Sequence, residues 1–149
     1  SGLLHSDFRT RSLDYEDLIT LTGVLTQDIR EVEKMYRLAI FNVFSHNRDD
    51  HSKNFSFLMD HMGEWKHSPA YDLTFSSGPR GQQSTMVMGE GQSPSIDHLV
   101  KLGAEANLKR AKIDKIIEQT KHALHQWENL AINYGVTKTN IKLIKSRML

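Results

Sequence analysis

The chain has 149 residues with a formal net charge of +1, 38% hydrophobic and 25% charged residues, and no cysteine. A chain of this length forms one domain that buries roughly 70% of its unfolded surface, and no apolar run approaches the ~20 residues that span a bilayer. Disulfides and thiolate metal sites are excluded, the composition fits a reducing cytoplasm, and the charge gives no broad attraction to nucleic acid.

Two helices are predicted first. Asp14 is a suitable N-cap for the first helix, and Thr26 is a suitable N-cap for the second, which has acidic residues in its first turn. Apolar residues at intervals of three and four give the second helix one buried face: Ile29, Val32, Tyr36, Ile40, Val43 and Phe44. We expect this helix to end near His46, because the stretch that follows is polar throughout.

The period then changes from helical to alternating. Residues 55–59 predict a strand, Gly63 a turn, and residues 64–67 a short partner strand. Pro69 should end this hairpin, because proline has no backbone donor and biases the preceding residue away from helix. Residues 76–81 contain two glycines and a proline and predict a loop.

The rest of the chain is predicted to be mainly helical, after a short strand at 86–88 and a turn at 89–91. Ser93 and Pro94 are typical of a helix start, and Thr139 should open a short last helix. Between them, residues 108–134 predict one long helix with a common apolar face: Ile113, Ile116, Ile117, Leu124, Trp127, Leu130, Ala131 and Tyr134. The expected fold class is α+β, mainly helical, with a small β-hairpin set into one domain.

The last helix carries bases without acids: Lys138, Lys142, Lys145 and Arg147. Such a face can contact a phosphate backbone, although a basic terminal helix is more often a solvated surface. The sequence leaves both interpretations open.

A polar stretch between the second helix and the hairpin carries the candidate chemistry. Asp49 and Asn54 have the spacing D-x-x-x-x-N, and Asp72 follows the hairpin. Phosphoryl transfer from ATP needs a carboxylate to receive the hydroxyl proton and hard oxygen ligands to hold magnesium. In protein kinases the base, the amide ligand, a hairpin and the carboxylate ligand come in this order. Asp49 or Asp72 alone would be read as an ordinary loop carboxylate, but their joint order favours the functional interpretation.

The same residues resemble a known family. The run 47–57, Gly63 and the run 68–73 are similar to the motifs of HipA-type serine/threonine kinases, the toxins of bacterial toxin–antitoxin pairs. Further similar segments lie at 13–15, 36–37 and 89–91, so the resemblance covers residues 3–105. It implies the helical, C-terminal lobe of a protein-kinase-like fold, with the hairpin carrying the metal site.

The resemblance also implies roles for individual residues. Asp49 matches the catalytic base, and Asn54 and Asp72 match the magnesium ligands that hold ATP. His51 lies two residues after the base, where protein kinases place a lysine that faces the transferred phosphate, and Lys53 is expected to reach the same group. Asp50 receives no definite role; capping the loop and supporting Asp49 from behind both stay open. The implied partners are a protein substrate, with aminoacyl-tRNA synthetases as the known class, and a helix-turn-helix antitoxin that brings indirect contact with DNA.

The chain also departs from the family. Nothing in it corresponds to the upstream lobe, with its phosphate-covering loop and phosphate-binding lysine, and 78–81 is expected to be a surface loop. We therefore expect residues 1–149 to be one catalytic-lobe domain that is inactive without its upper lobe.

Two other classes of function remain open. One is a non-catalytic kinase-fold module that docks an antitoxin–DNA complex. The other is a metal-dependent hydrolase with zinc or paired metals held by His46, Asp49, Asp50 and His51, which neighbouring Arg48 and Lys53 disfavour.

Overall fold

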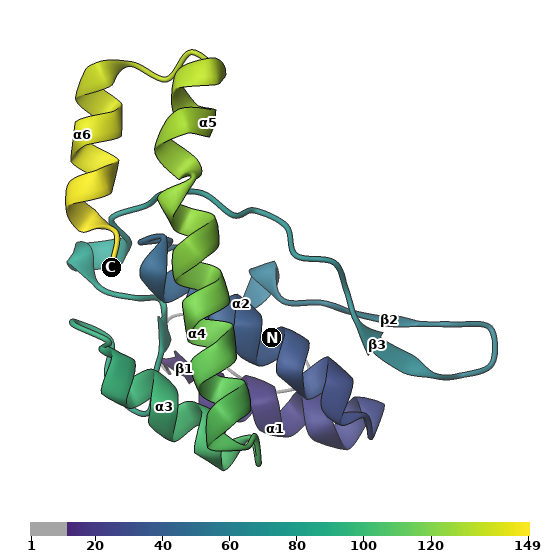
Figure 1. Ribbon diagram of the computed structural model, residues 1–149. Coiled ribbons are helices and arrows are strands. Elements are labelled where there is room, and N and C mark those ends of the chain that lie inside the picture. The colour runs from purple at the N-terminus through teal and green to yellow at the C-terminus, as the bar shows by residue number, and fades with distance from the viewer. Residues whose placement is uncertain (1–11) are drawn as a thin grey trace.

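The computed structural model of the protein describes residues 12–149. Figure 1 shows a mainly helical α+β fold, as predicted, in which short strands accompany the helices. The helices are α1 (Tyr15–Thr26), α2 (Ile29–Phe44), α3 (Ile96–Glu105), α4 (Arg110–His125), α5 (Trp127–Asn133) and α6 (Lys138–Arg147). The strands are β1 (Leu13–Asp14), β2 (Phe57–Met59), β3 (Trp65–His67) and β4 (Thr85–Met86), and short 3-10 helices span Ser52–Asn54 and Pro79–Gly81.

The first two helices start at acidic caps. Asp14 caps α1 by accepting a hydrogen bond from the Glu16 N–H, as predicted. Thr26, the predicted cap of the next helix, instead lies in the last turn of α1. Gln27 ends α1 with a φ of 50°, and Asp28 then caps α2 by accepting from the Arg30 N–H at 2.9 Å. The prediction was wrong by two residues because Asp28 is an equally good cap and Gln27 breaks the helix before it.

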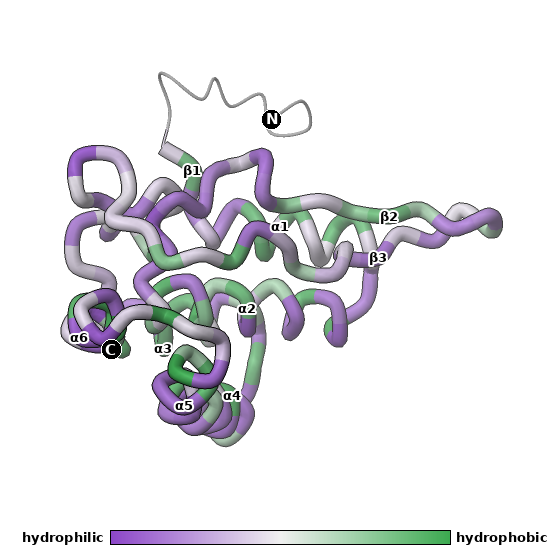
Figure 2. Tube along the Cα trace, turned by 90° about the horizontal axis from the view of Figure 1, so that it is seen from above, coloured by the Kyte–Doolittle hydropathy of each residue, from purple (hydrophilic) through white to green (hydrophobic). Residues whose placement is uncertain are grey.

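The core lies between α1, α2, α3 and α4. Its largest fully buried side chains come from all four helices and the segment after β4: Tyr15, Tyr36, Phe44, Met35, Ile40, Leu99, Leu102, Ile113, Ile116 and Val87. Figure 2 shows hydrophobic residues alternating with hydrophilic ones along α1 and α2. The predicted apolar face of α2 is confirmed except at Ile29, which is exposed in its first turn.

The long helix predicted over 108–134 is two helices. The Gln126 N–H bonds to the Ala123 carbonyl three residues back, and this tightened turn separates α4 from α5. In Figure 1, α5 extends the line of α4 beyond the body. Leu130 is therefore 53% exposed and Tyr134 85% exposed, against the prediction that both share the buried face.

Two later helix starts also differ from prediction. Ser95, and not Ser93, caps α3, and it shares a reciprocal capping box with His98. Thr137, and not Thr139, caps α6 by accepting from the Asn140 N–H. In both cases a second hydroxyl residue two positions away satisfied the same sequence criterion.

The strands form two small sheets. β2 and β3 pair antiparallel, with Phe57 opposite His67, and this predicted hairpin extends away from the helices in Figures 1 and 2. β2 starts two residues later than predicted, at Phe57, after a 3-10 helix at residues 52–54. β1 pairs in parallel with β4, which joins the start of α1 to the segment after the candidate site.

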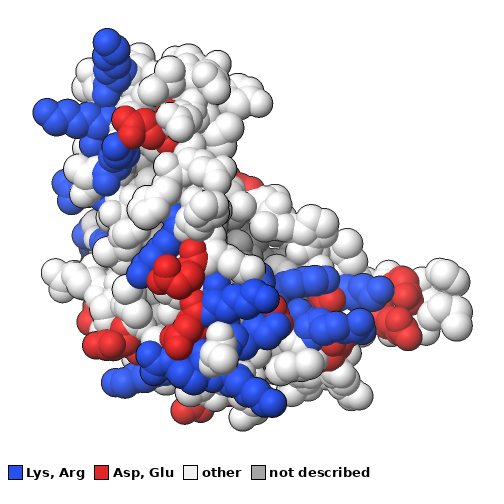
Figure 3. All heavy atoms as spheres, viewed as in Figure 1, with Lys and Arg blue, Asp and Glu red and all other residues white. Residues whose placement is uncertain are grey.

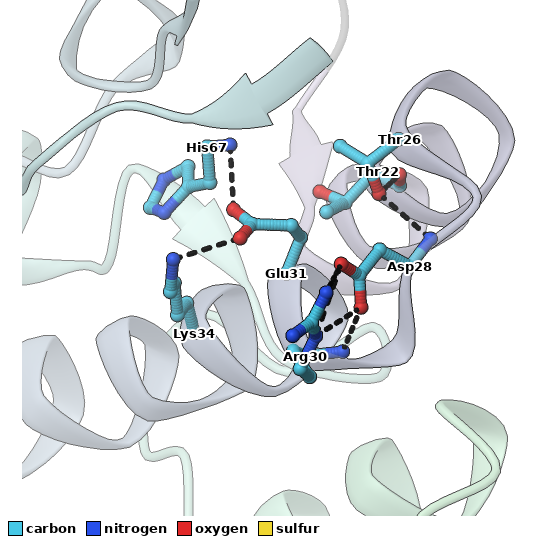
Figure 4. A network of polar contacts seen from close by, with 7 residues as sticks. All are labelled: Thr22, Thr26, Asp28, Arg30, Glu31, Lys34 and His67. Carbon is cyan, nitrogen blue, oxygen red and sulfur yellow. Dashed lines mark hydrogen bonds and ion pairs between the residues drawn. The ribbon is translucent and has the colours of Figure 1, made fainter. Parts of the chain in front are cut away.

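A buried carboxylate anchors the hairpin to α2. Glu31 is 4% exposed and accepts hydrogen bonds from the His67 N–H at 2.8 Å and from Lys34 Nζ at 2.7 Å (Figure 4). Burial acts to raise the pKa of Glu31, but the bonds from Lys34 and His67 lower it overall. The start of the segment that leads to Asp72 is thus fixed against α2.

Charged side chains of both signs lie on the face that Figure 3 shows. Lys and Arg side chains gather over α6, at the upper left of Figure 3, where Lys145 pairs with Glu128 of α5. Within residues 12–149, no helix combines the length and the apolar character needed to cross a membrane.

Candidate functional site

Asp49 and Asn54 are joined by a hydrogen bond across a short loop. After α2 the chain turns at His46, which has a φ of 57°, and reaches the 3-10 helix Ser52–Asn54. The side-chain Nδ2 of Asn54 donates to the Asp49 carbonyl at 3.0 Å, and the Asn54 N–H donates to the His51 carbonyl at 2.9 Å. The Asn54 side chain is therefore held beside Asp49, with its Oδ1 left as an acceptor, while the Asp49 side chain is exposed.

Asp72 lies on a segment that packs against this loop. The Tyr71 hydroxyl donates to the Lys53 carbonyl at 2.7 Å and contacts Ser56 Oγ at 2.6 Å. On the other side, Asn47 Nδ2 donates to the Asp72 carbonyl at 3.4 Å. The structure thus brings the predicted residues Asp49, Asn54 and Asp72 onto two segments in direct contact.

Backbone pairing continues this contact beyond Asp72. The Arg48 N–H donates to the Ser76 carbonyl at 3.1 Å, and the Ser76 N–H donates to the His46 carbonyl at 3.0 Å. Asp72 itself has a φ of 54°, an uncommon conformation for a residue other than glycine. Such strained positions gather at functional sites, where surrounding contacts hold them in place.

The donor set fits magnesium. Asn54 Oδ1 and the exposed Asp72 carboxylate are hard oxygen donors from adjacent segments. Magnesium usually keeps several waters and takes one or two protein ligands together with substrate phosphates, so two protein donors are sufficient.

Of the other predicted residues, Lys53 is exposed on the 3-10 helix beside Asn54, and His51 is half-buried at its start. In sequence, both follow Asp49, whose side chain is exposed. Their predicted contact with a phosphate stays a prediction.

The His/Asp constellation considered for zinc does not form a cluster. The described residues contain no group of three or more His, Cys, Asp or Glu side chains placed to share a metal. The His46 ring stacks on Phe75 with centroids 5.5 Å apart, and burial, with the charges of Arg48 and Arg147, lowers its pKa. Asp50 is fully buried and hydrogen-bonded to Tyr15. His46 and Asp50 therefore lie in different environments and do not form one metal site.

The loop 78–81 packs against Arg48, the residue before Asp49. A Cβ at Gly78, which has a φ of 69°, would lie 2.6 Å from Arg48 Cβ and 2.2 Å from the Gln82 carbonyl oxygen. Arg48 donates to the Gly81 carbonyl, and the Ser84 N–H donates to the Arg48 carbonyl at 3.0 Å. Its residues 79–81 are exposed, as expected of a surface loop, but its base is packed on Arg48.

Sequence reasoning missed the buried polar residues behind the loop. The Asp50 carboxylate accepts from Tyr15 Oη at 2.6 Å, from Gln83 Nε2 at 2.8 Å and from the Thr85 N–H at 3.0 Å. Burial raises the pKa of Asp50 to about 6, and these hydrogen bonds oppose the rise. Asn42, which bonds to Tyr15, gave the one usable signal, because it interrupts the apolar run 38–44.

Comparison with known proteins adds a family match. A family model described as the HipA-like C-terminal domain matches residues 1–127. A search of curated proteins found no match. The family match extends beyond the 3–105 region of resemblance and contains all the residues of the candidate site, whereas α6 lies after it.

Proposed function

Because the chain belongs to the family of HipA-like C-terminal domains, we propose that it is the catalytic lobe of an ATP-dependent serine/threonine protein kinase. The reaction transfers the γ-phosphoryl group of ATP to the hydroxyl oxygen of a serine or threonine and leaves ADP. The observation that supports this most is the closed geometry of Asp49 and Asn54, with the Asp72 segment held against the same loop.

Each of the three residues has a chemical task in this proposal. Asp49, exposed at the surface of the loop, orients the substrate hydroxyl and accepts its proton. Asn54 Oδ1 and the Asp72 carboxylate hold the magnesium ion. When bound, magnesium neutralises charge on the phosphates of ATP.

The site needs support from further residues. We infer that His51 and Lys53, two and four residues after Asp49, face the transferred phosphate. The lobe that covers the nucleotide would come from residues other than those described. The protein substrate would be a translation component such as an aminoacyl-tRNA synthetase, and a helix-turn-helix antitoxin would restrain the toxin.

A docking module without catalysis is the second candidate, and one surface feature favours it. An apolar groove of about 420 Å³ lies between α2, α4 and the segment 67–73, with Leu38, Phe41 and Leu73 among its lining residues. A module of this kind would bind a partner protein and move no phosphate.

Transfer of labelled γ-phosphate by the full-length natural protein tests the proposal. Positioning of a general base contributes about 10²–10⁴-fold to a rate, so Asp49→Asn should lose at least two orders of magnitude. Asp60→Asn, at the exposed hairpin tip, is the matched control and should retain transfer. A folded wild-type protein that binds magnesium-ATP but transfers nothing would contradict the kinase and favour the docking module.

A further inference from the structure

Asp50 follows the proposed base directly but has the opposite exposure. The Asp49 side chain is exposed, whereas Asp50 is 0% exposed. Both Asp50 carboxylate oxygens accept hydrogen bonds, Oδ2 from Tyr15 and Gln83 and Oδ1 from the Thr85 N–H. The Asp50 carbonyl also accepts a bond from the Thr85 hydroxyl. Hydrogen bonds to the side-chain and main-chain oxygens of Asp50 thus hold the residue that directly follows Asp49 in place.

These contacts belong to a closed ring of buried hydrogen bonds. Tyr15 Oη accepts from Asn42 Nδ2 at 2.9 Å, and Asn42 Oδ1 accepts from Asn47 Nδ2 at 3.0 Å. The Asn47 carbonyl accepts from Gln83 Nε2 at 2.9 Å, and Gln83 returns to Asp50. All five side chains are buried, and they come from α1, α2, the loop that bears Asp49 and the segment before β4.

The ring reaches both halves of the site. Through Asp50 it holds the loop next to Asp49, and through Asn47 Nδ2 it contacts the Asp72 carbonyl at 3.4 Å. In a buried ring each bond restricts its neighbours, so a change at one member is felt at the others. A shift of about 1 Å in a reacting group is enough to lower a rate by about 10²-fold.

Stability alone gives little reason for a carboxylate at this position. Burying a charge is unfavourable unless the charge is hydrogen-bonded, and apolar residues of similar volume can often replace buried ionic groups without loss of stability. The carboxylate, however, accepts from three donors at once, which a neutral amide cannot do with the same atoms.

We propose that Asp50 is a positioning residue, whose buried carboxylate sets the placement of Asp49 relative to the metal-binding side chains of Asn54 and Asp72. This role rests on the proposed kinase function. Asp50 touches neither substrate nor metal in this account, and it acts through the backbone of the loop.

Kinetics and stability measured together on the full-length natural protein test the role. At pH 7.5, Asp50→Asn should lower kcat roughly 10- to 100-fold while the KM for magnesium-ATP changes by no more than about twofold. Its free energy of unfolding, measured at the same pH, should stay high enough for the variant to be fully folded under the assay conditions. Tyr15→Phe should lower kcat less, because Asp50 keeps its bonds to Gln83 and Thr85. Asp97→Asn, exposed on α3, is the control and should leave kcat unchanged.

The outcomes separate this inference from the kinase proposal. A wild-type protein no more active than Asp49→Asn would contradict the kinase function, and the positioning role would fall with it. An active wild type with equal kcat in Asp50→Asn and Asp97→Asn would overturn the positioning role alone. A loss of kcat fully explained by lost stability would also overturn it. If Asp50→Asn does not fold, Tyr15→Phe decides: reduced kcat in a folded protein supports the role, and unchanged kcat refutes it.

Discussion

The side-chain amide of Asn54 donates a hydrogen bond of 3.0 Å to the backbone carbonyl of Asp49. The 3-10 turn Ser52–Asn54 makes this contact possible, because it reverses the chain within five residues. This orientation of the amide leaves Asn54 Oδ1 as an acceptor, and the Asp49 side chain is exposed. The five-residue spacing thus places the Asn54 side chain against the backbone of Asp49.

Tyr71→Phe tests how the Asp72 segment is held. The change removes the hydroxyl that donates to the Lys53 carbonyl and contacts Ser56 Oγ, and one such bond contributes about 0.5–1.5 kcal/mol to stability. We expect a loss of unfolding free energy within this range in urea denaturation, with a several-fold weaker magnesium-ATP affinity by calorimetry. Tyr134→Phe, at a position 85% exposed, is the matched control. Equal affinities in the two variants would show that Tyr71 does not position the segment.

Glu31→Gln tests the anchor of the hairpin. Glu31 accepts from both Lys34 Nζ and the His67 N–H, and a neutral amide has one acceptor oxygen for these two donors. We expect a loss of about 1–3 kcal/mol in the free energy of unfolding at pH 7, measured by chemical denaturation. Because the pKa of Glu31 is lowered in the folded state, this contribution is present above its unfolded pKa and is lost as the pH falls through the folded value.

Glu118→Gln provides the comparison for this prediction. Glu118 pairs with Lys121 on the exposed side of α4, and such surface pairs contribute little. Similar stability losses in the two glutamine variants would mean that Glu31 does not anchor β3.

Asp50 should give stability a distinct pH dependence. Burial raises its pKa from 3.8 to about 6, so its contribution is fully present below pH 3.8 and is lost as the pH rises through 6. The stability of the wild type relative to Asp50→Asn should therefore fall by up to about 3 kcal/mol between pH 4 and pH 7. Urea denaturation of both proteins across this range measures the difference. A flat or rising difference would show that the three donors hold Asp50 ionised throughout.

Most of the correct predictions came from patterns among residues that are close together in the chain. The spacing of Asp49 and Asn54, the apolar face of α2 and the Gly63 turn all depend on residues near one another in the chain. The errors at Thr26, Ser93 and Thr139 were also local, because a neighbouring side chain was an equally suitable cap.

Contacts between distant segments could not be predicted in this way. The bonds from Tyr15 and Gln83 to Asp50, and the parallel pairing of β1 with β4, join parts of the chain whose proximity depends on the whole fold. The burial of Leu130 was wrongly predicted for a related reason. The helical spacing of apolar residues continues past Gln126, but α5 extends beyond the core and leaves Leu130 exposed.

Magnesium-dependent binding of ATP, measured by calorimetry on full-length wild type, Asp49→Asn and Asp72→Asn, tests the central claim most directly. If Asp49 is the base and Asp72 a metal ligand, Asp49→Asn binds magnesium-ATP like the wild type, whereas Asp72→Asn loses the part of its affinity that depends on magnesium. Unchanged magnesium-dependent affinity in Asp72→Asn, or no nucleotide binding by the folded wild type, would contradict the account.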